Sequence, residues 1–399
     1  MSRSICILKN GNIRNLRFIG IVLVMVLVAG GCGNRQQAGN REAPGLSGAA
    51  GTKVVLQHAT GFSIEHVTGG TRIRVFNPWQ GAEGITFSYL LIHDSANLSA
   101  PPEEMIIRVP VRRIICLSTT HIGFIGFLGE ENSIVGVSGA GYVCNTKVRQ
   151  ALLEGRIKDV GYDMTLNYEL IVGLHPDLVL AYGVNSEVTG VYQKLKQLGI
   201  PTLFIGEYLE PTPLAKAEWV KLIACLYDRE DFAQEKFAAI EQSYTDTRNK
   251  VSAERTKPVL MTGLPWKESW NIPGGESYTA RLIADAGGSY LWEKYKTRDN
   301  IPLNVEEAVS DARIADIWIN AGVAKSMHDI LATDERLVDV RPFKLNQVYN
   351  NNASLCPGGG NAFWESGVVS PDVILKELAA IIHPEIIHVD TFRYYRKLN

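Results

Sequence analysis

Residues 166–183 read LNYELIVGLHPDLVLAYG and decide the fold of this chain. The stretch opens a helical pattern around Glu169 and then passes into a short apolar strand. Residues 303–322, LNVEEAVSDARIADIWINAG, repeat this order. The lengths between helix start and strand differ by two residues, so the counterpart of Glu169 is either Glu306 or Glu307. A helix-to-strand unit that occurs twice predicts two related α/β lobes.

The same pattern extends outward from these two stretches. Short apolar runs alternate with helical patterns from Arg113 and again after Lys257, which is typical of βα units around a mainly parallel sheet. We therefore expect an α/β fold with two Rossmann-like lobes, residues 111–228 and 256–399. Between them, Arg229–Val251 keeps apolar residues at a three-or-four spacing without proline or glycine, which predicts one amphipathic helix. These 23 residues would extend for roughly 34 Å, so the segment 229–255 is expected to link the lobes.

The residues before the first lobe divide into two parts. Residues 53–110 are alternating or β-rich, as in Thr71–Phe76 and Ile85–Ile92, and predict a small β-rich leader segment packed on the first lobe. Residues 32–52 are mostly small and polar, and they are expected to form a flexible tether.

The first 31 residues have the layout of a secretory signal peptide. Basic residues precede an uncharged run, Phe18–Ala29, that is too short to span a bilayer. Gly30, Gly31 and Cys32 follow, and this ending resembles the lipobox of bacterial lipoproteins, although Ala29 stands where leucine is usual. The resemblance implies that Cys32 is lipidated and that the mature protein is anchored to a bacterial membrane on the periplasmic side. The alternative is ordinary cleavage that leaves Cys32 free.

The composition is typical of a soluble globular protein. Hydrophobic residues make up 46% of the chain and charged residues 21%, and the net charge of −2 gives no electrostatic basis for nucleic-acid binding. Cys116 and Cys225 lie in apolar patterns and are expected to be buried, whereas Cys144 and Cys356 lie in predicted loops. Four cysteines allow three full pairings and the sequence does not choose among them, so a bridge between Cys144 and Cys356 stays open.

Candidate binding residues come after the predicted strands. In open α/β sheets the ligand lies beyond the carboxyl ends of the strands. The candidates after these strands are Thr119, Thr120, His121, Tyr142, Tyr182, Trp266 and Trp270. Tyr278, at the start of a predicted helix, is a further candidate. Flat rings with a few neutral donors suit a bulky, partly apolar solute with polar edges.

Patterns of catalysis and metal binding are weak in this chain. The stretch Gly136–Ala140 lacks the final glycine of a nucleophile elbow, and Gly358–Gly360 lacks the lysine of a phosphate loop. The histidines are dispersed, so we assign no catalytic residues and no metal ligands, and His121 has two interpretations, metal ligand or capping residue. Glu169 and Glu306 sit in the first turns of their predicted helices, where the helix dipole favours a carboxylate. The functional alternative is one acidic contact per lobe for a partner with basic sockets.

From Arg113 to about Pro384 the chain resembles the periplasmic binding proteins of ABC importers for iron-siderophore complexes and cobalamin. The matching segments are RIICLSTTH, GFLGEENSIVGVSG, DVGYDMTLNYELIVGLHPDLVLAY, KQLGIPTLFIG and IPGGESYTARLIADAGGSYLW. The resemblance implies a class III binding protein without an intrinsic cofactor, which captures an iron chelate, haem or cobalamin and delivers it to an ABC permease and its ATPase. It also implies that Glu169 and either Glu306 or Glu307 dock on that permease. The leader segment lies outside the resemblance.

Two other functions remain as alternatives to a binding component. One is an exported enzyme built like an α/β hydrolase, which an ordered nucleophile, base and oxyanion site would favour. The other is a lipoprotein that holds haem or a metal without a transporter, which several His or Cys ligands in one cleft would favour.

Overall fold

The computed structural model describes residues 51–93, 104–162, 165–184 and 188–399. The predicted signal peptide (1–31), the lipidation site Cys32 and nearly all of the tether (32–52) lie outside the described residues. The described residues belong to one compact unit, Ala43–Asn399. None of the helices among them combines the length and apolar character that a membrane span requires.

The leader segment forms a five-stranded sheet in the described part of the chain. Its strands pair in the order β1-β2-β3-β4-β5, antiparallel except for the parallel pair β4 and β5. Along β3, Ile73 and Val75 are fully buried, while Arg72 and Arg74 on the other face pair with Glu65, as expected for alternating side chains. The strands are β1 (Thr52–Lys53), β2 (Phe62–Val67), β3 (Gly70–Phe76), β4 (Thr86–His93) and β5 (Glu104–Val109).

The leader sheet packs directly on the first lobe, which we name the N-lobe; the second lobe is the C-lobe. The Phe87 ring lies 4.8 Å from the Phe204 ring, and the Phe62 ring lies 4.7 Å from the Trp219 ring. The Glu218 carboxylate accepts hydrogen bonds from the backbone N–H groups of residues 57–59. The leader and the N-lobe therefore share one hydrophobic core.

The N-lobe contains a parallel sheet of five described strands in the order β10-β9-β6-β7-β8. Four of these strands are buried along their whole length, as expected when helices or other elements cover both faces. The strands are β6 (Ile114–Cys116), β7 (Ile134–Val137), β8 (Lys158–Asp159), β9 (Leu178–Ala181) and β10 (Thr202–Phe204). The helices are α1 (Thr119–Leu128), α2 (Thr146–Leu153), α3 (Tyr168–Gly173), α4 (Val188–Gln197), α5 (Pro213–Glu218) and α6 (Val220–Ala224).

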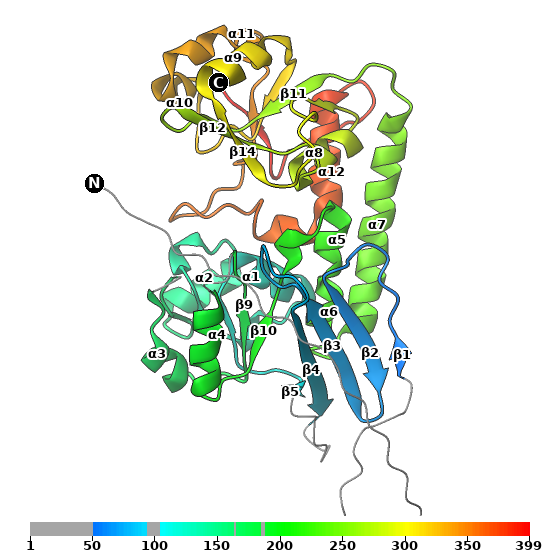
Figure 1. Cartoon of the computed structure of the whole chain (residues 1–399), viewed down its shortest axis with the longest axis vertical. Coiled ribbons are helices and arrows are strands. Elements are labelled where there is room, and N and C mark those ends of the chain that lie inside the picture. The colour runs from blue at the N-terminus through cyan, green and yellow to red at the C-terminus, as the bar shows by residue number, and fades with distance from the viewer. Residues whose placement is uncertain (1–50, 94–103, 163–164, 185–187) are drawn as a thin grey trace, which may run out of the picture. The chain divides into compact units, whose positions relative to one another are not determined.

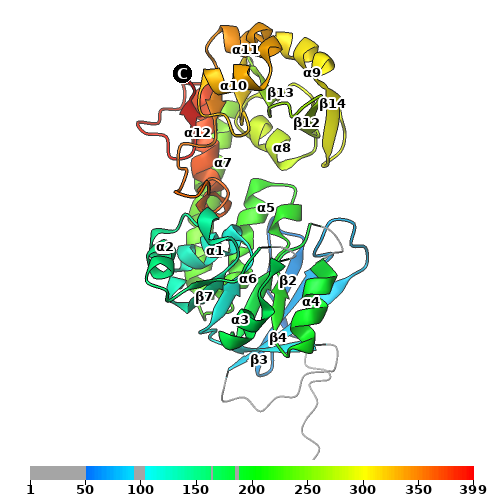
Figure 2. The ribbon, with the colours of Figure 1, turned by 90° about the vertical axis from the view of Figure 1, so that its left-hand side faces the viewer.

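One long helix, α7 (Glu230–Ser252), joins the lobes. Its buried residues Ala233 and Phe237 belong to the N-lobe core, whereas Tyr244 and Val251 belong to the C-lobe core. The helix runs beside both lobes in two perpendicular views (Figures 1 and 2). A single element thus contributes one end to each core, which is what a linking helix requires.

The C-lobe has a smaller parallel sheet, β13-β11-β15, with two antiparallel pairs beside it, β12-β14 and β16-β17. The final long helix, α12, packs against α7. The strands are β11 (Val259–Thr262), β12 (Ser269–Pro273), β13 (Ser289–Tyr290), β14 (Asn300–Asn304), β15 (Ile317–Ile319), β16 (Tyr349–Asn350) and β17 (Arg396–Lys397). The helices are α8 (Tyr278–Asp285), α9 (Val305–Asp311), α10 (Met327–Thr333), α11 (Arg341–Lys344) and α12 (Pro371–Ile382).

The repeat in the sequence reappears as equivalent contacts in the two lobes. Asp177, just before β9, accepts hydrogen bonds from the backbone N–H groups of Arg112 and Arg113, which precede the central strand β6. Asp316, just before β15, accepts one from the N–H of Val259 at the start of the central strand β11. Each aspartate therefore ties the start of its own strand to the neighbouring strand.

Residues 353–369, which we name the strap, depart from the expected boundary of the C-lobe at 256–399. The strap crosses back to the N-lobe, where Val369 joins the N-lobe core. Cys356 forms a disulfide with Cys144, with 5.4 Å between their Cα atoms. This bond settles the pairing that the sequence left open, and Cys116 and Cys225 are buried free thiols as expected.

Close backbone contacts hold the strap against the N-lobe. A Cβ atom at Gly360 would lie 2.1 Å from the carbonyl oxygen of Tyr142, and one at Gly123 in α1 would lie 2.1 Å from that of Glu365. The Glu365 carboxylate accepts a hydrogen bond from the Cys144 N–H at 2.7 Å. In the glycine run, Gly358 and Gly360 thus serve close backbone approach to Gly141 and Tyr142.

Candidate functional site

The cleft between the lobes contains a cavity of about 630 Å³, which we name the aromatic compartment. Its N-lobe wall follows the carboxyl ends of β6, β7, β8 and β9, and its C-lobe wall follows β15 and β16. The strap forms a third wall through residues such as Leu355 and Trp364. This is the place where open parallel sheets bind ligands, and the volume falls within the usual range for small-molecule sites.

Exposed rings give the aromatic compartment its character. The side chains of Tyr142 and Trp364 are 52% and 53% exposed, and Tyr162 is similarly accessible. The rings of Tyr142 and Tyr162 lie 6.1 Å apart. Large rings left open to solvent around one cavity mark a binding surface, because a folded protein normally buries most of such area.

The C-lobe wall is polar, and asparagine side chains hold part of its backbone in place. The Asn350 amide donates to the carbonyl oxygens of Gly322 and Ala324, and the Asn352 amide donates to that of Ala324. These asparagines hold the loop that carries Lys325. Lys325 is the one lysine or arginine among the described residues lining this compartment, and no described acidic side chain lines it.

The structure brings several predicted binding residues together and separates others. Thr119, Tyr142 and Tyr182 line the aromatic compartment. Thr120 lies beside it, with its hydroxyl 2.9 Å from that of Ser118. His121 is fully buried behind Tyr182, and neither ring nitrogen has a hydrogen-bond partner among the described residues. Burial lowers the pKa of His121 to about 3, so the ring is neutral at physiological pH.

The two predicted tryptophans of the C-lobe lie elsewhere. Trp270 is fully buried in the C-lobe core, where its ring packs against Trp292 and Trp318. Trp266 is 71% exposed in the turn before β12, outside the aromatic compartment. Neither tryptophan therefore lines the aromatic compartment as expected. Side chains alternate in direction along β12, so Trp270 points into the core, and Trp266 lies in a turn outside the cavity.

A second cavity of about 950 Å³ adjoins the first, and we name it the leader compartment. Trp364 lines both compartments, and the predicted residue Tyr278 lines this one. The turn between β3 and β4, Asn77–Gly84, forms its outer wall; we name this the leader turn. No sequence pattern singled out Trp364, Tyr162 or the leader turn, because long-range packing alone brings them to the cleft.

The described residues contain no cluster of three or more His, Cys, Asp or Glu side chains arranged to hold a metal ion. The groups that reach the aromatic compartment are rings, hydroxyls, amides and one ammonium. This set suits non-covalent binding of a bulky solute.

The sequence pattern of the family described as "Periplasmic binding protein" matches residues 114–354. The chain belongs to this family. Members bind solutes for ABC importers and are not enzymes as a class. The match begins at β6, so the leader segment lies outside it.

Relatives and solved structures agree with the family. An uncharacterised lipoprotein of Methanocaldococcus jannaschii is 26% identical over 304 residues, covering 74% of this chain and 70% of the relative. A periplasmic haem-binding protein from Pseudomonas aeruginosa superposes with a TM-score of 0.55 at 16% identity, covering 70% of this chain and 96% of that one. CeuE of Helicobacter pylori in a Ni-His complex gives a TM-score of 0.54 at 21% identity, covering 70% and 85%. At these identities the structures establish the periplasmic binding protein fold and nothing finer.

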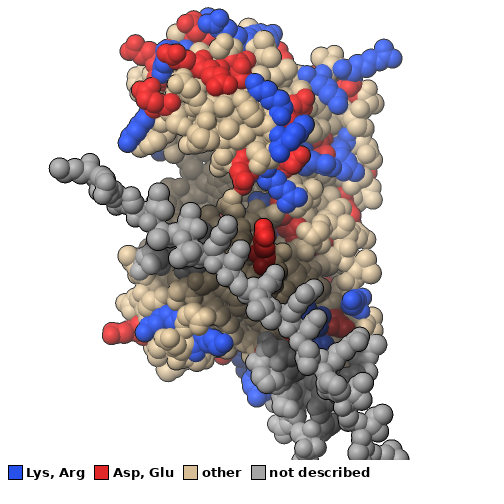
Figure 3. Space-filling view, viewed as in Figure 1, with Lys and Arg blue, Asp and Glu red and all other residues tan. Residues whose placement is uncertain are grey.

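The predicted docking glutamates of this periplasmic binding protein lie on its surface. Glu169 and Glu306 are each the second residue of their helices, α3 and α9, and both helices are capped by an asparagine side chain. Glu307 comes one position later. The matching positions make Glu306 the geometric counterpart of Glu169. On the face shown in Figure 3, the described acidic and basic side chains of the C-lobe are intermixed.

Proposed function

We propose that this periplasmic binding protein is the lipid-anchored receptor of an ABC importer for a bulky metal chelate. Its solute is an iron-siderophore complex, haem or cobalamin, held in the cleft and delivered to the permease. The observation that carries the proposal is the aromatic compartment, in which exposed rings from the N-lobe and the strap face one cavity. The haem and Ni-His ligands in the names of the structural neighbours support this class of solute.

The chemistry of the aromatic compartment suits such solutes. Tyrosine and tryptophan rings contribute large contact areas at little conformational cost. A macrocycle or siderophore has apolar faces that stack on rings and polar edges that accept from hydroxyls.

The first test identifies the solute. Protein purified from its native host would be analysed by mass spectrometry and by its absorbance spectrum, and the solute found would be titrated calorimetrically. We expect Trp364→Ala to weaken binding by about 1–3 kcal/mol, since a stacked ring is lost. Trp266→Ala is the matched control, because that ring lies outside both compartments. Recovery of no metal chelate, together with no binding of haemin, ferric siderophores or cobalamin, would refute the proposal.

The second test concerns delivery. In the proposal Glu169 and Glu306 dock on basic sockets of the permease, so Glu169→Arg with Glu306→Arg should abolish uptake in cells and leave solute affinity near the wild-type value. Glu307→Arg in place of Glu306→Arg distinguishes the two C-lobe candidates. Glu235→Arg on α7 is the control, because that side chain is also exposed. Normal uptake by the Glu169, Glu306 and Glu307 triple variant would show that these carboxylates only cap helices.

The third test concerns the anchor. Cys32→Ser should release the protein from the membrane fraction or block its processing, because the lipid would have no attachment site. A variant that fractionates with membranes as the wild type does would contradict lipidation at Cys32.

A further inference from the structure

The leader compartment is lined by all three parts of the molecule. The leader turn supplies Trp79 and Gln80, the N-lobe supplies Tyr208 and Lys216, and the C-lobe supplies Tyr278 and Asp299. The family match begins only at residue 114. This half of the cleft is therefore built partly by residues that the family match does not include.

Specific contacts hold the leader turn at this position. The Trp79 ring packs edge-on against Phe204 of β10 at 5.7 Å. The Gln80 backbone N–H donates to the Tyr208 hydroxyl at 3.2 Å, and its side-chain amide donates to Asp299 of the C-lobe at 2.8 Å. The wall is thus anchored in the N-lobe and also reaches the C-lobe.

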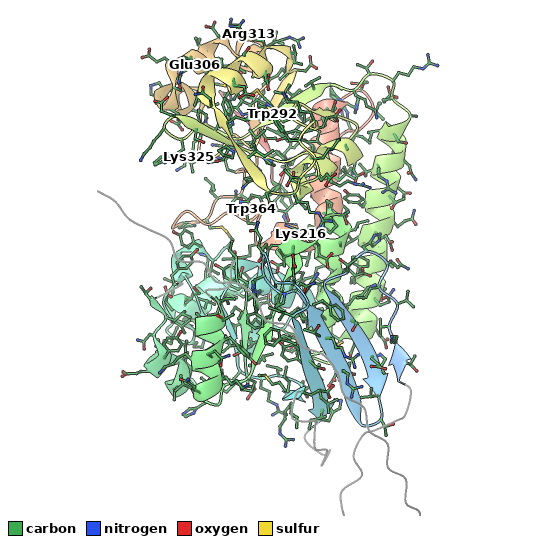
Figure 4. The ribbon with its side chains drawn as sticks, in the orientation of Figure 1. Lys216, Trp292, Glu306, Arg313, Lys325 and Trp364 are labelled. Atoms are coloured by element: carbon green, nitrogen blue, oxygen red, sulfur yellow. A yellow bond between two sulfur atoms is a disulfide. The ribbon has the colours of Figure 1, made fainter. Side chains whose placement is uncertain are left out.

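Lys216 brings an ammonium group to the leader compartment without a close counter-ion. Its Nζ lies over the Tyr278 ring, 4.5 Å from the centroid. Among the described residues, no carboxylate oxygen lies within 4.0 Å of this atom and no hydrogen-bond acceptor is in reach. Figure 4 shows Lys216 on α5 next to Trp364 of the strap, with Lys325 on the C-lobe above them.

Burial lowers the pKa of Lys216, and two carboxylates, Glu207 and Glu210, act against this effect from a longer distance. Glu210 accepts hydrogen bonds from the N–H groups of Thr60 and Gly61 and from the Trp219 indole. Glu207 is buried, burial raises its pKa, and its Oε2 atom has no hydrogen-bond partner among the described residues. The described residues therefore leave the three donors of the Lys216 ammonium free at the wall of the cavity, where a ligand or water can accept from them.

We propose that the leader compartment is the second half of the solute site and binds an anionic group of the solute, a carboxylate or a phosphate, through Lys216. The proposal rests on the proposed function, since it concerns the same cleft. The bulky neutral body of the solute lies on the rings of the aromatic compartment, and its anionic arm passes Trp364 to reach Lys216. The leader turn then contributes to solute selection, because it walls the space that the arm enters.

Two pairs of probes test the anionic arm. Haemin and its dimethyl ester differ only in whether the two carboxylates are free, and cyanocobalamin and dicyanocobinamide differ in the phosphate-bearing arm. We expect the wild type to prefer the anionic member of at least one pair, and the pair that shows the preference tells carboxylate from phosphate.

Lys216→Met should weaken binding of that member roughly 10- to 100-fold, as for a lost charged hydrogen bond, and Lys216→Arg should retain most of it. Lys194→Met on α4, an exposed lysine that lines neither compartment, should bind as the wild type does.

A second measurement does not depend on the identity of the solute. Lysines would be dimethylated with ¹³C-formaldehyde, the Lys216 signal would be assigned with Lys216→Arg, and acetate and inorganic phosphate would be titrated by NMR. We expect a saturable shift of the Lys216 signal at lower anion concentration than for Lys194. Absence of that shift, or equal binding of an anionic probe by wild type and Lys216→Met, would overturn the anion site. A saturable shift with none of the four probes bound would instead keep the anion site and count against the proposed metal-chelate function.

Discussion

The strap and the leader turn wall the two compartments of one cleft, but they are held in different ways. The strap is bound to the N-lobe by a disulfide, by the hydrogen bond from Cys144 to Glu365 and by Val369 in the core. The leader turn is anchored in the N-lobe, and it reaches the C-lobe through the side-chain hydrogen bond from Gln80 to Asp299. The strap therefore fixes the two lobes to each other, whereas the leader turn can separate from the C-lobe without disturbing a core.

The two walls also differ in what their movement would require. Opening at the strap would require breaking a covalent bond and unpacking buried residues. Moving the leader turn away from the C-lobe would require the loss of the exposed hydrogen bond from Gln80 to Asp299, which contributes about 1 kcal/mol or less. Variants in each wall test this contrast.

The largest effect is expected from the disulfide. Cys144→Ser with Cys356→Ser should lower the free energy of unfolding by about 2–5 kcal/mol, since the bond closes a loop with a sequence separation of 212 residues. Urea unfolding followed by circular dichroism measures the change. Reductant should destabilise the wild type and leave the double variant unaffected. An unchanged unfolding midpoint in the double variant would show that the strap is held without the bond.

The next effect concerns pH and Glu365. Burial raises the pKa of its carboxyl from 4.5 to about 7, so the folded state favours the protonated form. Its contribution to stability is then full below pH 4.5 and is lost as pH rises to about 7, a change of at most roughly 3 kcal/mol. Glu365→Gln should remove this loss, so that its stability relative to the wild type increases over that window.

The neutral His121 acts in the opposite direction and serves as an internal reference. Its pKa is lowered from 6.5 to about 3, so its contribution is lost as pH falls below 6.5. This loss should be the same in the wild type and in Glu365→Gln, and the difference between the two proteins isolates Glu365. Parallel pH profiles for the two proteins would mean that Glu365 is ionised in the folded state.

A smaller effect is expected where the strap crosses α1. Gly123→Ala should destabilise the protein by about 1–3 kcal/mol, because the new Cβ would meet the Glu365 carbonyl at 2.1 Å and the disulfide limits retreat of the strap. Gly190→Ala in α4 is the matched control, because nothing lies within 4 Å of its new Cβ. That variant should be neutral or more stable by up to about 1 kcal/mol. Similar thermal midpoints for the two variants would contradict the close crossing.

The smallest effect is expected at the leader turn. Gln80→Ala should change the free energy of unfolding by less than about 1 kcal/mol, because the lost hydrogen bond is exposed. Hydrogen exchange should nevertheless become faster at the amides of the leader turn and remain unchanged in the strap. Faster exchange in the strap would show that the two walls move together and would remove the contrast.

The two lobes show which local patterns carry enough information to predict structure. The α/β class was predicted and is confirmed, because strands buried on both faces leave continuous apolar runs such as Leu178–Ala181. The spacing along Arg229–Val251 predicted a helix that the structure has as α7, Glu230–Ser252. The placement of Trp270 was missed, because a ring after a strand can face the cavity or the core with the same local sequence.

The sequence by itself determined the alternation of helix and strand, the repeat around Glu169 and Glu306, and the apolar stripe of the linking helix. Each of these is a periodic pattern within about 25 residues, where side-chain direction follows from backbone geometry. Tertiary structure alone decided the partner of Cys144, the return of the strap to the N-lobe, and the meeting of Trp364 and Lys216 beside the leader turn. Those contacts join segments far apart in the chain, and their energies depend on packing and burial that no local pattern encodes.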